Sequence, residues 1–280
     1  MAPRRRARGG ALRPAVRLIH PAPAVAVIAV STALGAILVS QEGLPLDGRL
    51  ALLVASVAAS QVATGALNDW VDRARDADGR SDKPIPSGQA TSATALVMGS
   101  VALALQLATS ALLGPLTLVL GGVASASAQI YNFALSRTPL SVVPYLVSFG
   151  VLPAWIASGV GVPLDRVVSA SFLVVPFAAA AHLANALRDW EADAAAGSRN
   201  LAQVMGRGRS RVLAVGLALG VGIGVAVAFA LSDRLQPVSV ALGAVGIAAV
   251  AQGVASERRL WYGLLAAAVV WTVAWALSTG

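Results

Sequence analysis

Residues 68–88 read NDWVDRARDADGRSDKPIPSG and connect two long apolar segments. The stretch holds five aspartates, three arginines and one lysine. A connection that only has to stay hydrated can be built from serine and glycine, so this density of carboxylates needs another explanation. The explanation depends on where the stretch lies, how its carboxylates are spaced and whether the chain repeats them.

The chain around this stretch is strongly apolar. Of its 280 residues, 57% are hydrophobic and 12% are charged, and the mean hydropathy is +0.74. Soluble domains carry roughly a quarter charged residues, so the composition predicts an integral membrane protein. In such a chain the net charge of +8 reflects membrane orientation, and no nucleic-acid partner is predicted. The sequence has no cysteine, which excludes disulfides and thiolate metal sites.

Nine apolar segments are long enough to cross a bilayer, which takes about 20 residues of helix. They are residues 17–40, 49–67, 90–111, 115–134, 140–160, 166–187, 211–231, 236–255 and 260–278. With the N-terminus inside, 18 of the 21 lysines and arginines lie in segments that face the cytoplasm. This distribution is the positive-inside pattern of membrane proteins, and it supports an odd number of spans.

These patterns predict an all-α integral membrane protein whose N-terminus is cytoplasmic. We expect a single domain over residues 1–280, a basic cytoplasmic tail at 1–16, and cytoplasmic loops at 68–89 and 188–211. We expect membrane lipid around it, in the cell (inner or plasma) membrane, and a site that opens toward the cytoplasm.

Two motifs of equal spacing follow two of the spans. Each has the pattern Asn-x3-Asp-x3-Asp, and the two consist of Asn68, Asp72, Asp76 and of Asn185, Asp189, Asp193. Residues at i, i+4 and i+8 lie on one face of a helix, so each motif places an amide and two carboxylates in a row. Like charges at this spacing destabilise an isolated helix, unless a cation neutralises them. One such motif is commonly a solvated loop, but two matching copies on one side of the membrane indicate a binding site.

The ligand types indicate the cation. Carboxylate and amide oxygens without cysteine or nearby histidine suit Mg²⁺, which takes one or two carboxylates together with phosphate oxygens and water. Two facing rows would hold two or three Mg²⁺ ions that bridge a diphosphate. Such ions make diphosphate a better leaving group, because they neutralise the charge that develops on its oxygens.

Several motifs together resemble the UbiA superfamily of intramembrane prenyltransferases, over most of the chain. They are the first motif, the turn DKPIPSG at 82–88, the second motif, and YNFALSRTPL at 131–140. The resemblance implies nine transmembrane helices around a central cavity. It also implies that an allylic polyprenyl diphosphate is ionised and that a lipophilic acceptor, aromatic or a quinone precursor, attacks the resulting carbocation.

The resemblance also implies roles for single residues. The implied catalytic and metal ligands are Asp72, Asp76, Asp189 and Asp193, with Asn68 and Asp69 as further metal ligands. The implied or candidate substrate contacts are Asn68, Asn185, Lys83, Tyr131, Arg137, Arg17 and His182. The position that usually carries lysine is Ser136 here, so either Arg137 supplies the charge or the pocket differs. His182 is either a substrate contact or a histidine hydrogen-bonded between helices, and Lys83 and Arg137 also have purely structural interpretations.

Other reactions and another class of protein stay open at this point. Members of the superfamily also cyclise an isoprenoid without an acceptor, make haem O or transfer phosphoribose to a polyprenyl phosphate. A divalent-cation channel or transporter would place ionisable groups at membrane depth, whereas the charged residues here lie at the edges of the predicted spans. Polar residues inside the spans, such as Gln61, Gln129 and Tyr145, are candidates for the cavity wall. The tryptophans Trp155, Trp261, Trp271 and Trp275 are expected in interface belts or lipid contacts, with shielding of a carbocation as the alternative for some of them.

Overall fold

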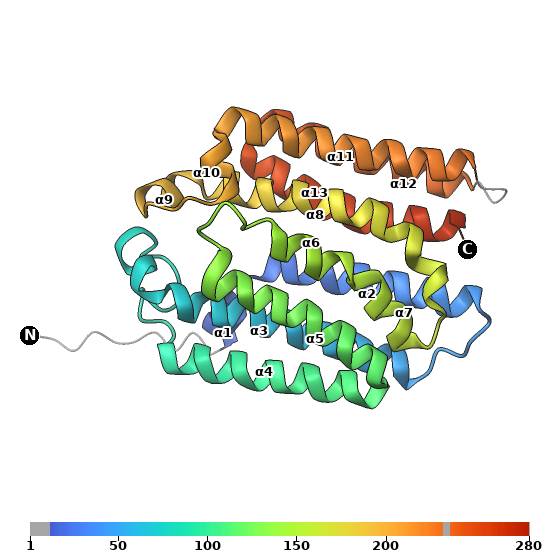
Figure 1. Ribbon diagram of the computed structural model, residues 1–280, viewed down its shortest axis with the longest axis horizontal. Coiled ribbons are helices and arrows are strands. Elements are labelled where there is room, and N and C mark those ends of the chain that lie inside the picture. The colour runs from blue at the N-terminus through green and yellow to red at the C-terminus, as the bar shows by residue number, and fades with distance from the viewer. Residues whose placement is uncertain (1–11, 232–235, 280) are drawn as a thin grey trace, which may run out of the picture.

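The computed structural model describes residues 12–231 and 236–279, so the predicted tail at 1–16 lies mostly outside the described residues. Within these ranges the chain forms a bundle of helices without a strand (Figure 1). The long helices are α2 (Pro21–Gln41), α3 (Gly48–Gly79), α4 (Ser92–Leu113), α5 (Pro115–Ile130), α8 (Val168–Arg188), α11 (Arg207–Ala230), α12 (Pro237–Ala251) and α13 (Glu257–Thr279). The shorter ones are α1 (Leu12–Leu18), α6 (Val143–Gly150), α7 (Leu152–Val160), α9 (Trp190–Ala195) and α10 (Leu201–Met205).

Nine segments of the described chain are helical, long and apolar enough to cross a membrane, which confirms the predicted number of spans. The fourth joins α5 to a π-helical turn, Tyr131–Leu135, and the fifth consists of α6 and α7. Proline lies in the first turn of five helices, at Pro21, Pro115, Pro144, Pro153 and Pro237. Proline suits this position because the first backbone N–H groups of a helix have no partner within it.

The helices pack around two apolar clusters. One cluster joins α8, α11 and α13, and the other joins α2, α3 and α7. Alanine and glycine allow close approach between the helices, as in other membrane bundles. A Cβ on Gly65 of α3 would lie 2.7 Å from the backbone oxygen of Leu18, so the junction of α1 and α2 rests directly on α3.

Four tryptophans lie inside the bundle rather than at a lipid interface. Trp155, Trp261, Trp271 and Trp275 are at most 5% exposed, so the expectation of lipid contact was wrong for these residues. Trp271 shows the reason, because its indole Nε1 donates to the Gly243 oxygen at 3.0 Å. Small residues on the neighbouring helices leave room for these large rings, and helix packing takes them out of the lipid.

The length of α3 positions the first motif. This helix has 32 residues, whereas about 20 suffice to cross the hydrocarbon core. Residues 68–79 therefore continue the helix, and only 80–89 of the predicted loop 68–89 form turns. Figure 1 shows the far end of α3 at the same end of the bundle as α9 and α10. The two aspartate motifs thus lie at one end of the molecule.

Candidate functional site

A cavity of about 530 Å³ lies at this end of the bundle, between the two motifs. Its polar wall includes Arg17, Asn68, Asp69, Asp72, Arg75, Arg80, Lys83, Tyr131, Asn185, Arg188, Asp189 and Asp193. The structure therefore brings together nine of the residues that the sequence proposed as ligands or substrate contacts. Gln61 and Tyr145 also line the cavity, whereas Gln129 does not.

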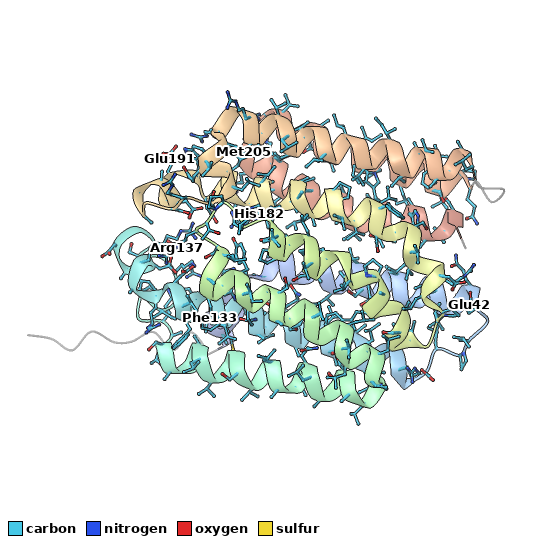
Figure 2. The ribbon with its side chains drawn as sticks, in the orientation of Figure 1. Glu42, Phe133, Arg137, His182, Glu191 and Met205 are labelled. Atoms are coloured by element: carbon cyan, nitrogen blue, oxygen red, sulfur yellow. The ribbon has the colours of Figure 1, made fainter. Side chains whose placement is uncertain are left out.

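Three of the proposed residues do not line this cavity. Asp76 is 2% exposed and lies behind the Lys83 ammonium. Arg137 contacts Asp72 and lies at the same end of the bundle as Glu191, whereas Glu42 lies at the other end (Figure 2). His182 is 1% exposed, and its Nε2 lies 3.0 Å from the hydroxyl of Ser141. These surroundings agree with the second alternative for His182, a buried histidine that is hydrogen-bonded to a neighbouring element, and not with a substrate contact.

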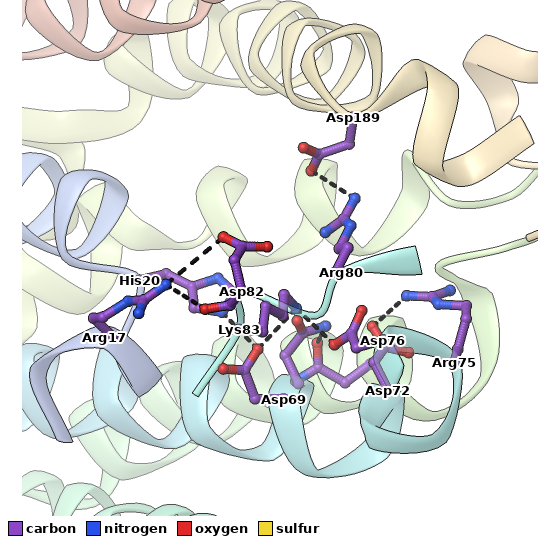
Figure 3. A network of polar contacts seen from close by, with 12 residues as sticks. Arg17, His20, Asp69, Asp72, Arg75, Asp76, Arg80, Asp82, Lys83 and Asp189 are labelled. Carbon is purple, nitrogen blue, oxygen red and sulfur yellow. Dashed lines mark hydrogen bonds and ion pairs between the residues drawn. The ribbon is translucent and has the colours of Figure 1, made fainter. Parts of the chain in front are cut away.

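The first motif is held by a lysine from the following turn. The Lys83 ammonium lies 2.9 Å from Asp69 Oδ1 and 2.9 Å from Asp76 Oδ2 (Figure 3). Burial alone would lower the pKa of Lys83, but these two carboxylates raise it above its ordinary value. His20 Nε2, at the start of α2, lies 2.9 Å from the same Asp69 oxygen. The turn after α3 is thereby fastened to the helix whose aspartates it covers.

Asp72, in the middle of this row, is bound by two arginines. Arg75 Nη2 lies 2.5 Å from Oδ2, and Arg137 Nη2 lies 3.2 Å from Oδ1. Arg75 is on α3, whereas Arg137 follows the π-helical turn. The two arginines thus reach the Asp72 carboxylate from different elements. Arg73, by contrast, stacks on Trp70 at 4.7 Å and donates to its backbone oxygen.

The second motif is divided by a break in the helix. Asn185 is on α8, Asp189 lies between α8 and α9, and Asp193 is on α9. The backbone hydrogen bonds from Asp189 N to the Asn185 oxygen (3.3 Å) and from Asp193 N to the Asp189 oxygen (3.0 Å) nevertheless keep the helical spacing. Asn185, Asp189 and Asp193 therefore keep the predicted spacing of about one helical turn, although the helix is interrupted at Asp189.

The two carboxylates of this motif have different electrostatic surroundings. Burial alone would raise the pKa of Asp189, but the hydrogen bond and charge of Arg188 hold it below its ordinary value. Arg80, from the turn after α3, lies 3.4 Å from the same carboxylate and joins the two motifs (Figure 3). Burial raises the pKa of Asp193, and the charge of Asp189 raises it further.

Some residues of the site were not identified from the sequence. Arg80 and Arg188 line the cavity and bind Asp189. Asn200, which precedes α10 and is 3% exposed, donates from Nδ2 to Asp193 Oδ2 at 2.9 Å. The adjacency of Arg188 to Asp189 was a usable signal for that arginine. No sequence pattern indicated Asn200, because its contact depends on how the chain returns after α9.

The donor set fits Mg²⁺. Carboxylate and amide oxygens of both motifs face one cavity, and Asp69 Oδ2 is buried without a hydrogen-bond partner in the described chain. Within that chain, no three His, Cys, Asp or Glu side chains come close enough to hold an ion alone. Mg²⁺ commonly binds through one or two carboxylates and completes its shell with phosphate oxygens and water. The site therefore suits ions that arrive with a phosphorylated ligand.

An apolar pocket of about 130 Å³ adjoins the cavity. Four residues, Val27, Phe149, Leu152 and Ala181, line both spaces. The pocket extends between α2, α7, α8, α11 and α13, and Trp271 and Trp275 form part of its wall. A charged cavity next to an apolar pocket fits a ligand that has a charged head and a hydrocarbon tail.

Two tyrosines lie on the wall between the motifs and Phe149, which belongs to both spaces. Tyr131 and Tyr145 pack edge to face with ring centroids 5.4 Å apart. Tyr145 also packs on Phe149, at 5.8 Å, and on His182, at 4.9 Å. Tyr131 begins the π-helical turn, a feature that is frequent at functional sites. The aromatic faces thus lie next to the position where a head group would meet its tail.

Comparison with known proteins identifies the family. The model of the UbiA prenyltransferase family matches residues 29–261. No curated protein has a significantly similar sequence. A UbiA homolog from Archaeoglobus fulgidus bound to GPP and Mg²⁺ has a TM-score of 0.69 at 18% identity, covering 95% of this chain and 100% of that one.

Two other solved structures show the same fold. The apo UbiA homolog from Aeropyrum pernix K1 has a TM-score of 0.67 at 19% identity, covering 89% of this chain and 94% of that one. A digeranylgeranylglyceryl phosphate synthase has a TM-score of 0.67 at 15% identity, covering 96% and 98%. Because the family match spans most of the chain and includes both aspartate motifs, this multi-pass membrane protein belongs to the UbiA prenyltransferase family.

Proposed function

We propose that the protein transfers an isoprenoid from an allylic polyprenyl diphosphate to a lipophilic or aromatic acceptor and releases diphosphate, with Mg²⁺ as its cofactor. One observation carries the proposal: a mouth with two rows of carboxylates and several guanidinium groups adjoins an apolar pocket. The homolog bound to GPP and Mg²⁺ adds support from the family.

The charged mouth would bind the diphosphate. Two or three Mg²⁺ ions would be held by Asp72, Asp189 and Asp193, with Asn68 and Asp69 as further ligands. Asp76 would join them when the Lys83 ammonium moves away from its carboxylate. These ions would neutralise the charge that develops on the leaving diphosphate. Arg75, Arg80 and Arg188 would donate to phosphate oxygens, for which the planar guanidinium group is well suited. Arg17, Lys83, Tyr131, Asn185 and Arg137 would provide further polar contacts around the head group.

The apolar pocket would hold the isoprenoid tail, and water is excluded there by the packed side chains of the bundle. When the allylic C–O bond breaks, its electron pair leaves with the diphosphate. Tyr131 and Tyr145, which line the cavity, would lie near the resulting cation and help to stabilise it. The acceptor then supplies the electron pair of the new bond and loses a proton. Membrane lipid surrounds both substrates, and we place the site at the cytoplasmic face of the cell membrane.

The test is diphosphate release by the purified protein in lipid nanodiscs. Allylic diphosphates of several chain lengths would be supplied with Mg²⁺, first alone and then with aromatic, quinone-precursor and glyceryl ether acceptors, each beside an EDTA control. We expect release to require Mg²⁺ and an acceptor. Asp72→Ala and Asp189→Ala should each reduce release roughly a hundredfold or more, the size of effect seen when charge stabilisation is removed from an active site.

Asp78→Ala is the matched control, because Asp78 is an exposed aspartate on the same helix and does not line the cavity. It should release diphosphate at the wild-type rate. Substantial release by folded Asp72→Ala would refute the metal-site assignment. Mg²⁺-dependent release of a hydrocarbon or terpene alcohol without any acceptor would instead identify a cyclase. Turnover only when phosphoribosyl diphosphate is supplied together with a polyprenyl phosphate would identify the phosphoribosyl transfer of the superfamily.

A further inference from the structure

A buried asparagine lies behind the first residue of the first motif. Asn132, in the π-helical turn, is 3% exposed. Its Nδ2 donates to the backbone oxygen of Thr64 at 3.0 Å and to Gln129 Oε1 at 3.2 Å. Its Oδ1 accepts from Asn68 Nδ2 at 3.2 Å. The three hydrogen bonds use both ends of the Asn132 amide.

These contacts determine which way each amide points. A backbone carbonyl can only accept, so the NH₂ group of Asn132 has to face Thr64 and its oxygen has to face Asn68. A carbonyl oxygen of Asn132 can also only accept, so Asn68 has to present its own NH₂ group to it. The Oδ1 atom of Asn68 is thereby turned away from Asn132. It accepts no hydrogen bond from another described residue, and Asn68 lines the cavity.

We infer that Asn132 is a positioning residue, which fixes the Asn68 amide so that its oxygen, and not its NH₂ group, faces the diphosphate and metal ions. The inference rests on the proposed function. Hard cations bind oxygen ligands, whereas an amide NH₂ turned toward a cation would repel it. The chain Thr64–Asn132–Asn68 begins at a backbone atom of α3, which cannot turn over, so the orientation does not depend on any other side chain.

The rival explanation is that Asn132 only joins the π-helical turn to α3. The two roles differ in what a carboxylate at position 68 would change. Asn68→Asp presents an oxygen in either orientation, so its side chain does not need to be oriented. The carboxylate has the same shape as the amide, so the π-helical turn still packs against a side chain of the same size, although the hydrogen bond to Asn132 is lost. In that background, loss of Asn132 should no longer affect metal-dependent binding. It should even relieve the repulsion between the new carboxylate and Asn132 Oδ1.

The experiment compares wild type, Asn132→Leu, Asn68→Asp and the double variant in nanodiscs. Isothermal titration calorimetry measures the Kd of geranyl and farnesyl thiolodiphosphates, in which sulfur replaces the bridging oxygen so that no reaction follows, with Mg²⁺ and with EDTA. Thermal unfolding reports the stability of each variant. Gln129→Met is the matched control, because it removes the other partner of Asn132 but keeps the hydrogen bonds to Thr64 and Asn68.

We expect Asn132→Leu to weaken Mg²⁺-dependent binding about tenfold, as for other residues that orient metal ligands, and Gln129→Met to change it less than about twofold. In the Asn68→Asp background, Asn132→Leu should not weaken binding. An equal loss in both backgrounds, or no loss in wild type, would overturn the inference. If Asn132→Leu does not fold, Asn132→Ser, whose hydroxyl is too short to reach Asn68, takes its place in the cycle. Wild-type protein that binds neither probe with Mg²⁺ would refute the proposed function itself.

Discussion

The aspartates of the site are neutralised by side chains of the protein itself. Lys83 pairs with Asp69 and Asp76, and Arg75 and Arg137 pair with Asp72. A buried ion pair contributes little when it is complete, because desolvation offsets the attraction, but removal of one partner leaves an uncompensated charge. This cost is largest for Lys83, whose two carboxylate partners are almost fully buried, and smaller for Arg137, whose side chain is 46% exposed.

Lys83→Met should lower the free energy of unfolding by roughly 3 kcal/mol, the size of effect expected when a buried pair loses one partner. Because the pKa of Lys83 is raised, its contribution is complete below the ordinary value of 10.5 and is lost as pH rises through the raised pKa. The difference between wild type and variant, measured by unfolding in detergent, should therefore be constant near neutral pH and shrink only in strong alkali.

Neutralising the carboxylates provides the control for this prediction. Adding Asp69→Asn and Asp76→Asn to Lys83→Met should recover most of the lost stability, since no buried charge then lacks a partner. Equal stability of Lys83→Met and wild type at neutral pH would show that the ammonium does not hold the turn to α3.

A second residue-scale prediction concerns Asn200, which both binds Asp193 and caps α10. Its Oδ1 accepts from Gln203 N at 2.9 Å, and its Nδ2 donates to Asp193. Asn200→Ser keeps a side chain that caps helices well but cannot reach Asp193. We expect unchanged thermal stability and about tenfold weaker Mg²⁺-dependent binding of the thiolodiphosphate probe. Asn200→Ala should lose stability as well, and wild-type binding by Asn200→Ser would contradict the role in holding Asp193.

At the scale of elements, the site depends on how the start of the chain rests on α3. The junction of α1 and α2 contacts this helix at Gly65, one turn before Asp69. His20 lies at that junction, with φ 50°, and its imidazole reaches Asp69. Arg17 donates to the backbone oxygen of Asp82 at 2.6 Å and so reaches the turn after α3. One close approach between backbones thereby positions two side chains near the mouth.

Gly65→Ala should disturb this arrangement, because the added Cβ would lie 2.7 Å from a backbone oxygen and 2.9 Å from Ile19 Cα. We expect a loss of about 1–3 kcal/mol in the free energy of unfolding, typical of overpacking. Gly79→Ala, at the end of the same helix, is the control, since its Cβ would meet nothing within 4 Å. Equal melting temperatures for the two variants would show that the junction can move without cost.

Sequence patterns located the membrane spans, but they missed the helices α9 and α10 within the predicted loop 188–211 and the contacts between elements. Hydropathy located the nine spans, and the spacing of the motifs placed Asp72 and Asp189 on one cavity. The burial of Asp76 under Lys83 and the hydrogen bond of Asn132 to Thr64 were not predictable, because each depends on how segments come together after the helices form. The four tryptophans were misjudged for the same reason.

At the scale of the whole molecule, the two ends of the bundle differ in chemistry. The end with the motifs carries Arg137 and Glu191, whereas Glu42 marks the opposite end (Figure 2). From the distribution of basic residues in the sequence, the positive-inside rule predicts that the end with the motifs faces the cytoplasm and that the N-terminus is inside. The chain has no cysteine, so single cysteines can report on each end without further engineering.

Ala196→Cys and Leu46→Cys test this orientation. Both side chains are exposed. Ala196 follows α9, and Leu46, which is 71% exposed, precedes α3 at the other end of the bundle. A membrane-impermeant maleimide should label Ala196→Cys only in inside-out vesicles and Leu46→Cys only in right-side-out vesicles. The cysteine-free parent is the control for background labelling, and the reverse pattern would place the site on the outer face.

The near balance of charge around the cavity bears on how a substrate is captured. The wall carries Arg17, Arg75, Arg80, Lys83 and Arg188 together with Asp69, Asp72, Asp189 and Asp193. Seen from more than a Debye length, about 8 Å at physiological ionic strength, such a surface has little field of its own. The cavity wall itself therefore provides little long-range steering of an anion, unlike a cleft of one sign, and any such steering comes from the other basic residues at this end of the bundle. A lipid-borne diphosphate would reach the mouth by lateral diffusion in the bilayer and would be bound there by contacts at short range.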